Sequence, residues 1–596
     1  MKKNKKDRNL KVVWYFLKQY KIYFLFLVII SIFAVLIESI NVGLMYPILD
    51  KMLDANAGGN FFVNTVDKYI QIIPIQDEYI RYATIFISIA TTVFLIKLIY
   101  YYLSVKFQAK IVKETKRKMF NKCIMSDYQY FVDNKQGEIL YKTSQAPESI
   151  AKVLQILSDI FLHLFLAISV FGMLFSMSWK LILIVIVGGV LYFQLIKYIS
   201  TRISYKAGRK KRDSAQKERV VVTEYTSGIK QIRVFETFNY WTEMFNKTIN
   251  KFWFYHRKNY FWTKIPDILL WFVIYFVIGS AIIVIRMQYP GDFGALLPLI
   301  GTFATGIFIV LPKISQFGNF RIQFMHLMPN VEIVYEELKD KSYTKIKNGT
   351  KKFKKLKKGI FFKNVSFSHK ERDVLLKNIN MSVEKDKVTA LVGPSGSGKS
   401  TIVNLMLRLF DVEGGGVYID DTNIKEFDIF TFLEKVGFVS QDTFIFNGTI
   451  KENISFGKEF SNEEIINASK KAGAHSFIKI LPDGYDTIVG DRGVRLSGGE
   501  QQRIAIARAI IRKPEILFLD EATSSLDNVT EKMVQKAIDT ISKSCTTFLI
   551  AHRLSTVRNA DVIHVLDNGK IVESGSHKEL LEKKGKYYEL YKSQEK

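Results

Sequence analysis

The stretch LVGPSGSGKST, from Leu391 to Thr401, decides how the second half of this chain folds. It fits the phosphate-binding pattern GxxxxGK[ST] without a mismatch. Gly393, Gly396 and Gly398 permit a tight turn that aims backbone N–H groups at an anion, and Lys399 can reach the β- and γ-phosphates. An apolar run precedes the stretch and a helical pattern follows it, which is the strand, loop and helix order that the pattern requires. We therefore expect a nucleoside triphosphate to bind here.

The neighbouring residues extend this expected site. Val388–Val392 is the predicted strand, and Ser400 offers its hydroxyl to Mg²⁺. Further phosphate-loop positions expected to contact the nucleotide are Pro394, Ser395, Ser397 and Thr401. ATP and Mg²⁺ are the expected ligands.

A second apolar strand, within EILFLDEAT, ends in two carboxylates. Asp520 at the strand end suits the coordination shell of Mg²⁺. Glu521 suits a general base that polarises the attacking water. The two roles need different environments, since one carboxylate is held by the metal and the other stays free to accept a proton. The sequence thus predicts an ATPase.

The first part of the chain, up to about residue 335, has the composition of a membrane domain. Six apolar stretches approach the roughly 20 residues that cross a bilayer. The second and fifth stretches argue against buried helices of a soluble protein, because few soluble domains bury such helices on every face. We expect spans at about 22–48, 79–103, 156–177, 180–199, 266–286 and 293–313.

The placement of charge predicts the orientation of these spans. The formal net charge is +28, and basic residues gather at the N-terminus and in the connections after the second and fourth spans. The connection after the first span instead carries Asp50, Asp54 and Asp67. This alternation is the positive-inside pattern. We expect a multi-pass protein of the cytoplasmic membrane with both termini and the ATPase domain in the cytosol, and the charge to serve topology and anionic lipids rather than nucleic acid.

The expected fold is a membrane α-helical domain followed by an α/β P-loop ATPase domain. The two long cytosolic connections read as polar amphipathic helices that extend the spans. Lys341–Gly359 is rich in lysine, and mutual repulsion predicts an extended, solvated linker, with contact to lipid headgroups as the alternative. The expected domains are 1–335 with six membrane helices, 336–358 as the linker and 359–596 as the ATPase domain.

Between the phosphate loop and Asp520 lies VRLSGGEQQRIAIARA, Val494 to Ala509. Its Ser497, Gly498 and Gly499 precede a helical pattern, so they can present N–H groups and a hydroxyl to an anion. The run LSGGEQ, which also includes Glu500 and Gln501, resembles the signature of ATP-binding cassette (ABC) transporters. Unrelated ATPases that share the phosphate loop lack this signature.

The resemblance assigns roles to further residues. Gln441 in FVSQD is similar to the Q-loop glutamine, which touches Mg²⁺ and the water. Asp527 in SSLD is similar to the D-loop, and His552 in IAHRLST to the switch histidine that contacts the γ-phosphate and positions Glu521. His369 occupies the place of the family's adenine-stacking aromatic residue. It either stacks on adenine with less ring area, which weakens the preference for ATP over GTP, or is an ordinary loop histidine.

The resemblance also implies an assembly. In the family the signature of one subunit closes on the phosphate loop of the other, so one cassette per chain implies a half-transporter that works as a dimer. All motif positions are present, which favours a homodimer over a pair with a degenerate partner. Six spans fused ahead of one cassette resemble exporters, with coupling helices expected near Asp127–Gln136 and Thr226–Phe235.

The transported molecule is the least determined property. Glu38 and Lys97 are ionisable residues at membrane depth and are candidates for the substrate pathway, with snorkelling or a structural hydrogen bond as the alternative. Counting from the cytosolic ends places Glu38 toward the outer side and Lys97 nearer the inner side, so we do not expect them to pair. A lipid or lipid-linked glycan is the favoured substrate, and a peptide or a drug is the alternative. A non-transporting ABC ATPase is a remote alternative that membrane fractionation would test.

Overall fold

The structure is a computed structural model that describes residues 2–45, 48, 74–177, 194, 205–288, 293–340, 348–368, 374–490, 493–520, 528–551 and 556–595. Contacts divide the chain into two compact units. The helical unit comprises Met1–Met125 and Phe131–Ser342, and the α/β unit comprises Ser126–Tyr130 and Tyr343–Lys596. Each unit is described by itself below.

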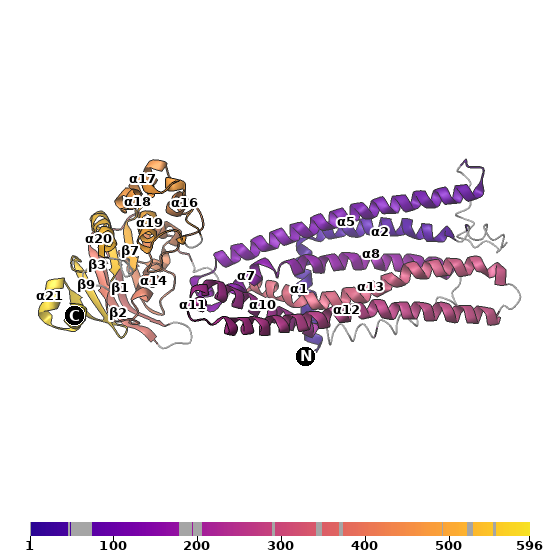
Figure 1. Ribbon diagram of the computed structural model, residues 1–596, viewed down its shortest axis with the longest axis horizontal. Helices are drawn as coiled ribbons and strands as arrows, with labels where there is room; N and C mark the ends of the chain where they lie inside the picture. The colour runs from indigo at the N-terminus through magenta and orange to yellow at the C-terminus, as the bar shows by residue number, and fades with distance from the viewer. Residues whose placement is uncertain are drawn as a thin grey trace. The chain divides into compact units, whose positions relative to one another are not determined.

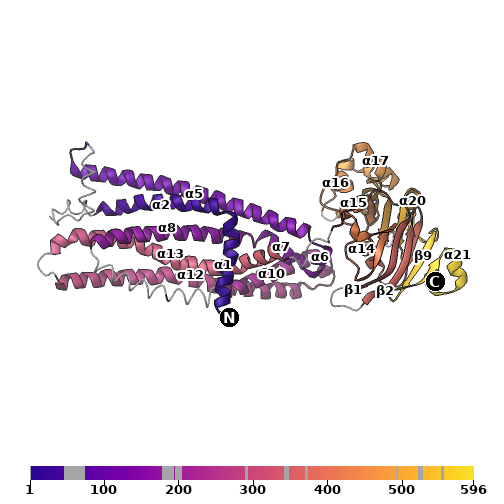
Figure 2. The same cartoon turned by 180° about the vertical axis from the view of Figure 1, so that it is seen from behind.

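Long helices make up the helical unit (Figure 1). Their bounds are α1 (Lys2–Gln19), α2 (Lys21–Gly43), α5 (Glu78–Ile124), α6 (Tyr128–Asp133), α7 (Gln136–Ser144), α8 (Glu148–Met177), α10 (Tyr205–Ser227), α11 (Ile229–Val234), α12 (Phe238–Gln288) and α13 (Phe293–Lys339). Helices α2, α5, α8, α12 and α13 run lengthwise together, whereas α1 crosses them (Figure 2). The core of this unit forms where α2, α8 and α13 pack side by side.

The described parts of the expected spans are helical, and most of these helices continue well beyond the apolar stretch. Helix α5 reaches Ile124 and α13 reaches Lys339, because polar amphipathic sequence carries on the helical period after each apolar run. Among the described residues, three helices are long and apolar enough to cross a membrane. The expected fourth span, 180–199, lies almost wholly outside the described residues.

The α/β unit contains two sheets. One has the order β2-β1-β4-β5 and the other the order β10-β9-β3-β8-β7-β6. The strands are β1 (Gly359–Ser368), β2 (Val374–Glu384), β3 (Val388–Val392), β4 (Gly414–Ile419), β5 (Thr422–Asn423), β6 (Val436–Val439), β7 (Ile516–Asp520), β8 (Thr546–Ile550), β9 (Val562–Asp567) and β10 (Lys570–Gly575). All five residues of β7 and of β8 are buried, as expected for the centre of a parallel sheet that is covered on both faces.

Helices surround the larger sheet (Figure 1). They are α14 (Lys399–Met406), α15 (Ile429–Leu433), α16 (Ile450–Ser455), α17 (Asn462–Lys471), α18 (His475–Ile480), α19 (Gly498–Ile510), α20 (Asn528–Ser542), α21 (His577–Lys583) and α22 (Lys586–Glu595), with short 3₁₀ turns at Ile424–Glu426 and Gly484–Asp486. The sequence pattern S/T-x-x-E starts α16, α17, α19 and α21 with a reciprocal capping box.

The lysine-rich segment differs from the expected solvated linker over residues 348–358. Phe353 and Leu356 are buried in the core of the α/β unit, and Lys351 forms an ion pair with Glu426. Asp420 accepts hydrogen bonds from the backbone N–H groups that lead into β1. Apolar residues set between the lysines explain the difference, because burying two large side chains outweighs the repulsion of exposed, screened charges.

A short piece of the connection that follows the second expected span belongs to the α/β unit. Ser126–Tyr130 clusters with that unit, and the ring of Tyr128 meets the ring of Phe410 edge-on at 5.6 Å between centroids. Tyr130 is buried as well. The short helices α6 and α11 lie within the two segments where coupling helices are expected, and their coupling role stays a prediction.

Candidate nucleotide and substrate sites

The predicted nucleotide-site residues that the structure describes lie at one edge of the six-stranded sheet, where its parallel strands end. β3 leads into the phosphate loop, β7 ends at Asp520, and β6 ends just before Gln441. β3, β8, β7 and β6 pair in parallel in that order. Because parallel strands end on the same side, the loops that follow them meet at this edge.

The phosphate loop has the strand, loop and helix form that the sequence predicts. Gly398 caps α14 with a φ of +106°, and a Cβ at this position would lie 2.7 Å from Cδ2 of Leu376. Lys399 is buried and donates hydrogen bonds to the carbonyl oxygens of Gly393 at 2.9 Å and Pro394 at 3.0 Å. The ammonium group therefore lies inside the curve of the loop, at a helix N-terminus that favours anions.

The remaining loop residues divide by exposure. Ser395, Gly396 and Ser400 are exposed, and Ser397 and Thr401 are buried. Gly396 has a φ of +80°, and nothing lies within 4 Å of a Cβ built on it. The exposed rim of the loop is thus formed by small residues, which let a phosphate approach the backbone closely.

Four predicted site residues lie outside the described part of the chain: His369, Glu521, Asp527 and His552. Their roles stay predictions. Glu521 directly follows Asp520, the buried last residue of β7, and His552 follows the end of β8 closely in sequence. Both strands end at the edge that carries the phosphate loop.

The donor set at this edge fits Mg²⁺. Ser400 could offer a hydroxyl, Gln441 an amide oxygen and Asp520 a carboxylate, and hard oxygen donors are what Mg²⁺ prefers. Mg²⁺ usually keeps several waters and takes its other ligands from the phosphates, so few protein groups are needed.

The signature forms the start of helix α19. The Ser497 hydroxyl and backbone N–H both donate to a carboxylate oxygen of Glu500, at 2.9 Å and 2.8 Å. Gln501 donates to the carbonyl oxygens of Gly493 at 2.9 Å and Leu496 at 3.2 Å. Glu500 therefore caps the start of the helix and Gln501 turns back onto the preceding loop, while Ser497 and Gly498 are exposed at the helix N-terminus.

A buried histidine lies behind the phosphate loop. His564 of β9 pairs in register with Leu391 of β3, and its ring contacts the Ser574 hydroxyl at 2.7 Å and the Ser382 carbonyl at 3.1 Å. Burial lowers the pKa of His564 below its usual range. The imidazole is therefore neutral at physiological pH, and the positive charge near the loop comes from Lys399.

Glu38 and Lys97 form an ion pair, with 2.7 Å between Oε2 and Nζ, which corrects the expectation that they lie at different depths. The same antiparallel alignment of α2 and α5 that brings Glu38 next to Lys97 also accounts for two other contacts between residues 20–23 and α5. Tyr20 contacts Glu114, and Tyr23 contacts Lys110. The expectation was wrong because α5 runs without a break far past its apolar stretch, so counting from the end of that stretch misplaced Lys97.

Further polar side chains that the sequence analysis missed lie near this pair. The Tyr100 hydroxyl donates to Asp159 at 3.0 Å, and His163 Nδ1 donates to the Asp159 carbonyl at 2.6 Å. Lys313 of α13 lies within electrostatic range of Glu38 and Lys97. The spacing of Asp159 and His163, on one face of an apolar helix, was the signal that could have revealed them.

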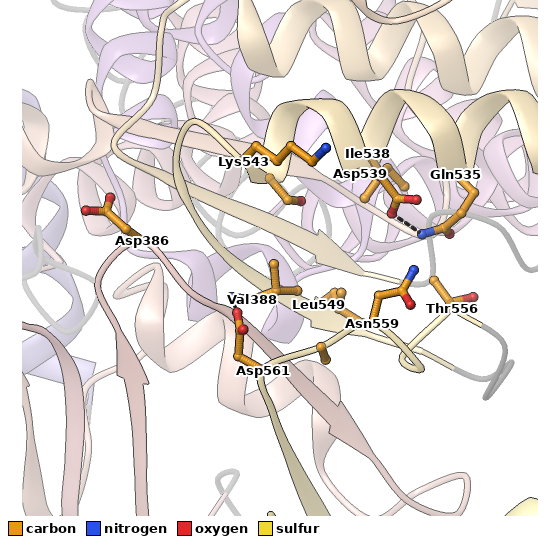
Figure 3. A pocket seen from close by; sticks show the side chains of 12 residues that line it. Asp386, Val388, Gln535, Ile538, Asp539, Lys543, Leu549, Thr556, Asn559 and Asp561 are labelled. Carbon is orange, nitrogen blue, oxygen red and sulfur yellow. Dashed lines mark hydrogen bonds between the residues drawn. The ribbon is translucent and has the colours of Figure 1, made fainter. Parts of the chain in front are cut away.

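A separate pocket of the α/β unit, with a volume of about 460 Å³, lies between the start of β3 and the end of α20 (Figure 3). Three carboxylates and one ammonium group line it, from Asp386, Asp539, Asp561 and Lys543. Asp561 accepts a hydrogen bond from the backbone N–H of Val388 at 2.8 Å. This excess of negative charge opposes phosphate binding, so the pocket is not the nucleotide site.

Family models match both parts of the chain. The model described as ABC transporter transmembrane region matches residues 23–288, and the model described as ABC transporter matches residues 376–524. The matches cover most of the helical unit and the segment from β2 to just beyond Asp520.

Individual relatives extend over most of the chain. An ATP-dependent lipid A-core flippase of Haemophilus influenzae is 35% identical over 81% of this chain and 83% of its own length. A Staphylococcus aureus protein whose name describes multidrug export is 32% identical over 94% of this chain and 97% of its own. The solved structure of a bacterial Atm1-family ABC exporter with ATP bound has the same fold, with a TM-score of 0.81, 22% identity and coverage of 97% of this chain and 98% of its own.

The geometry at Gly398 generates a test of the phosphate loop. Gly398→Ala forces a side chain into a left-handed residue and against Leu376, so we expect ATP affinity to fall about tenfold or more. Gly457→Ala is the matched control, because Gly457 has a φ of +75° and open space around its Cβ position. Titration with a fluorescent ATP analogue would measure both variants. An equal loss of ATP affinity in both variants would show that backbone strain, wherever it lies, lowers the affinity, and that Gly398 has no special role in the phosphate loop.

Proposed function

We propose that this chain, which belongs to the ABC transporter family, exports or flips a lipid or lipid-linked glycan. It is an exporter-type membrane region fused to one cassette, and the ATPase activity of the cassette is coupled to transport. The observation that carries the proposal is the polar cluster of the helical unit, formed by Glu38, Lys97, Tyr100, Asp159 and His163. A multidrug or peptide substrate is the second candidate, supported by the multidrug relative.

The cluster suits an amphipathic substrate. Charged groups inside apolar helices cost free energy unless they pair or meet a polar ligand. Here they gather on α2, α5 and α8, with Lys313 on α13, while the outer faces of these helices expose apolar side chains such as Leu36 and Phe94. A molecule with a polar headgroup and an acyl chain matches both surfaces.

For hydrolysis we infer the following division of roles. Lys399 and the backbone of the phosphate loop hold the triphosphate. Ser400, Gln441 and Asp520 would hold Mg²⁺, which would neutralise phosphate charge when bound. Glu521 accepts the proton of the attacking water and His552 positions it, with Asp527 at the dimer contact and His369 beside the adenine.

We further propose a homodimer with composite sites. Ser497 and Gly498 are exposed at a helix N-terminus, as a group that serves a second subunit must be. The second connection also carries exposed apolar side chains near its middle, with Val234 at 69% and Phe235 at 73% exposure at the end of α11. Such a surface is typical of an interaction site. One chain carries every motif, so two identical chains suffice.

The proposed placement has both termini and the cassette in the cytosol, since the basic residues gather at the N-terminus and after the second and fourth spans. We keep the division into 1–335, 336–358 and 359–596, with the second half of the linker packed on the cassette.

Glu521→Gln tests the catalytic assignment. The amide keeps the shape of the side chain but cannot accept a proton, so we expect ATP to bind normally and the turnover rate to fall by about 10²- to 10⁴-fold. Phosphate release by the purified protein measures turnover, and Glu463→Gln on the exposed face of α17 serves as the control. Wild-type turnover in Glu521→Gln would remove Glu521 from its role.

A mixing experiment tests the composite site. Lys399→Ala disables the phosphate loop and Ser497→Phe blocks the signature, so each variant alone should be inactive. Co-expressed with different affinity tags and purified through both, the mixed dimer retains one intact loop facing one intact signature. We expect it to regain partial ATPase activity. An inactive mixed dimer would mean that each chain builds its site alone or with a different partner.

Transport of a fluorescent phosphatidylglycerol in proteoliposomes tests the substrate class. We expect ATP-dependent movement of the labelled lipid between leaflets, and little movement of a cationic dye. Glu38→Gln and Lys97→Gln each leave one half-buried charge without its partner, and the double variant removes both charges. If the pair contacts the headgroup, the double variant stays about tenfold impaired like the single ones. Recovery of transport in the double variant would instead assign the pair a structural role.

A further inference from the structure

Arg508, near the end of the signature helix α19, holds the segment that follows Gln441. Its Nε donates to the carbonyl oxygen of Asn453 at 2.8 Å, and one terminal nitrogen donates to the carbonyl oxygen of Phe444 at 2.8 Å. The other terminal nitrogen lies 3.2 Å from the side-chain oxygen of Asn453. One side chain thus ties α19 both to the loop that follows β6 and to α16.

Two stacked aromatic rings lie beside the guanidinium group. The ring of Phe456 lies 4.5 Å from Cζ of Arg508 and that of Phe446 lies 5.7 Å from it, while the two rings stack on each other at 5.0 Å. Burial lowers the pKa of Arg508 to about 10, which still leaves it charged at physiological pH. Cations packed against aromatic faces and bonded to several oxygens are held in one geometry.

Asn453 makes the held segment rigid. It is fully buried, accepts a hydrogen bond from the N–H of Phe446 at 3.0 Å, and donates to the carbonyl oxygens of Phe446 at 2.9 Å and Thr449 at 3.0 Å. The residues from Phe444 to Phe456 are therefore held together by hydrogen bonds, and Arg508 is bonded to the beginning of this segment at Phe444 and near its end at Asn453.

We propose that Arg508 is the positioning residue that transmits movement of the signature helix to the segment after Gln441, and so couples nucleotide closure to transport. The proposal rests on the proposed function, because it takes Ser497 to meet the nucleotide of a second subunit. Ser497 caps the N-terminus of α19 and Arg508 lies in its last turn, so a stiff helix of 13 residues joins the two points. Movement at one end must displace the other.

Lysine cannot replace this arginine. The guanidinium fork donates in several directions at once and presents a flat face to the rings, whereas an ammonium group is a compact point charge. Arg508→Lys therefore keeps the charge and removes the geometry. The substitution therefore tests the hydrogen-bonded link between α19 and Phe444–Phe456 while a positive charge stays at position 508.

Amide hydrogen exchange of the full chain in lipid nanodiscs tests the connection directly. In the wild type, adding ADP and vanadate should slow exchange about tenfold both in α19 and in the segment Phe444–Phe456. In Arg508→Lys we expect the slowing in α19 alone. We also expect ATP turnover within about threefold of the wild type, but about tenfold less labelled lipid moved for each ATP hydrolysed.

Arg512→Lys is the matched control, since Arg512 lies two residues past the end of α19 at Ile510 and its side chain makes no hydrogen bond within the described part of the chain. It should respond like the wild type. If Arg508→Lys unfolds, Phe456→Leu is the variant to test, because it keeps the arginine and removes its closest ring. If the slowing of exchange in Phe444–Phe456 falls to half of the wild-type value, the proposal is supported. An unchanged response in either variant, or none in the wild type, overturns it. A wild type that shows the exchange response but moves no lipid would refute the substrate and leave the connection standing.

Discussion

The parallel pairing of β3, β8, β7 and β6 is the constraint on which the nucleotide site depends. Parallel strands place all their carboxyl ends at one edge, so residues far apart in the sequence meet there without any direct attraction between them. The burial of β7 and β8 on both faces explains why this arrangement is stable, and it also explains why the functional side chains begin only after each strand ends. The functional side chains are the first residues of each chain segment that leave the buried core.

The parts of the structure that the sequence predicted are those governed by local rules. The phosphate loop needs glycine at defined positions, and Gly398 has the left-handed conformation that its pattern requires. The start of α19 was predicted for the same reason, because Ser497 and Glu500 form a capping box within one turn. Such features depend on neighbours in the chain, and their patterns can be read without knowledge of the fold.

The features that sequence reasoning missed depend on contacts between distant segments. The depth of Lys97 is set by the register of α5 against α2, which no local pattern specifies. Phe353 and Leu356 looked like minor interruptions of a lysine-rich linker, yet their burial decides where residues 348–358 lie. The geometry of Arg508 is also invisible in the sequence, because its partners come from the loop after β6 and from α16.

The contact of Tyr128 with Phe410 has a consequence for how the protein can be divided. Ser126–Tyr130 lies within the helical half of the sequence but packs with the α/β unit, so no single cut separates two complete folding units. A cassette expressed alone from residue 343 onward would present the ring of Phe410, now 8% exposed, to water. The isolated piece would expose an apolar surface that Ser126–Tyr130 covers in the intact chain. Poor solubility of that piece would then result from where the chain was truncated and not from the cassette itself.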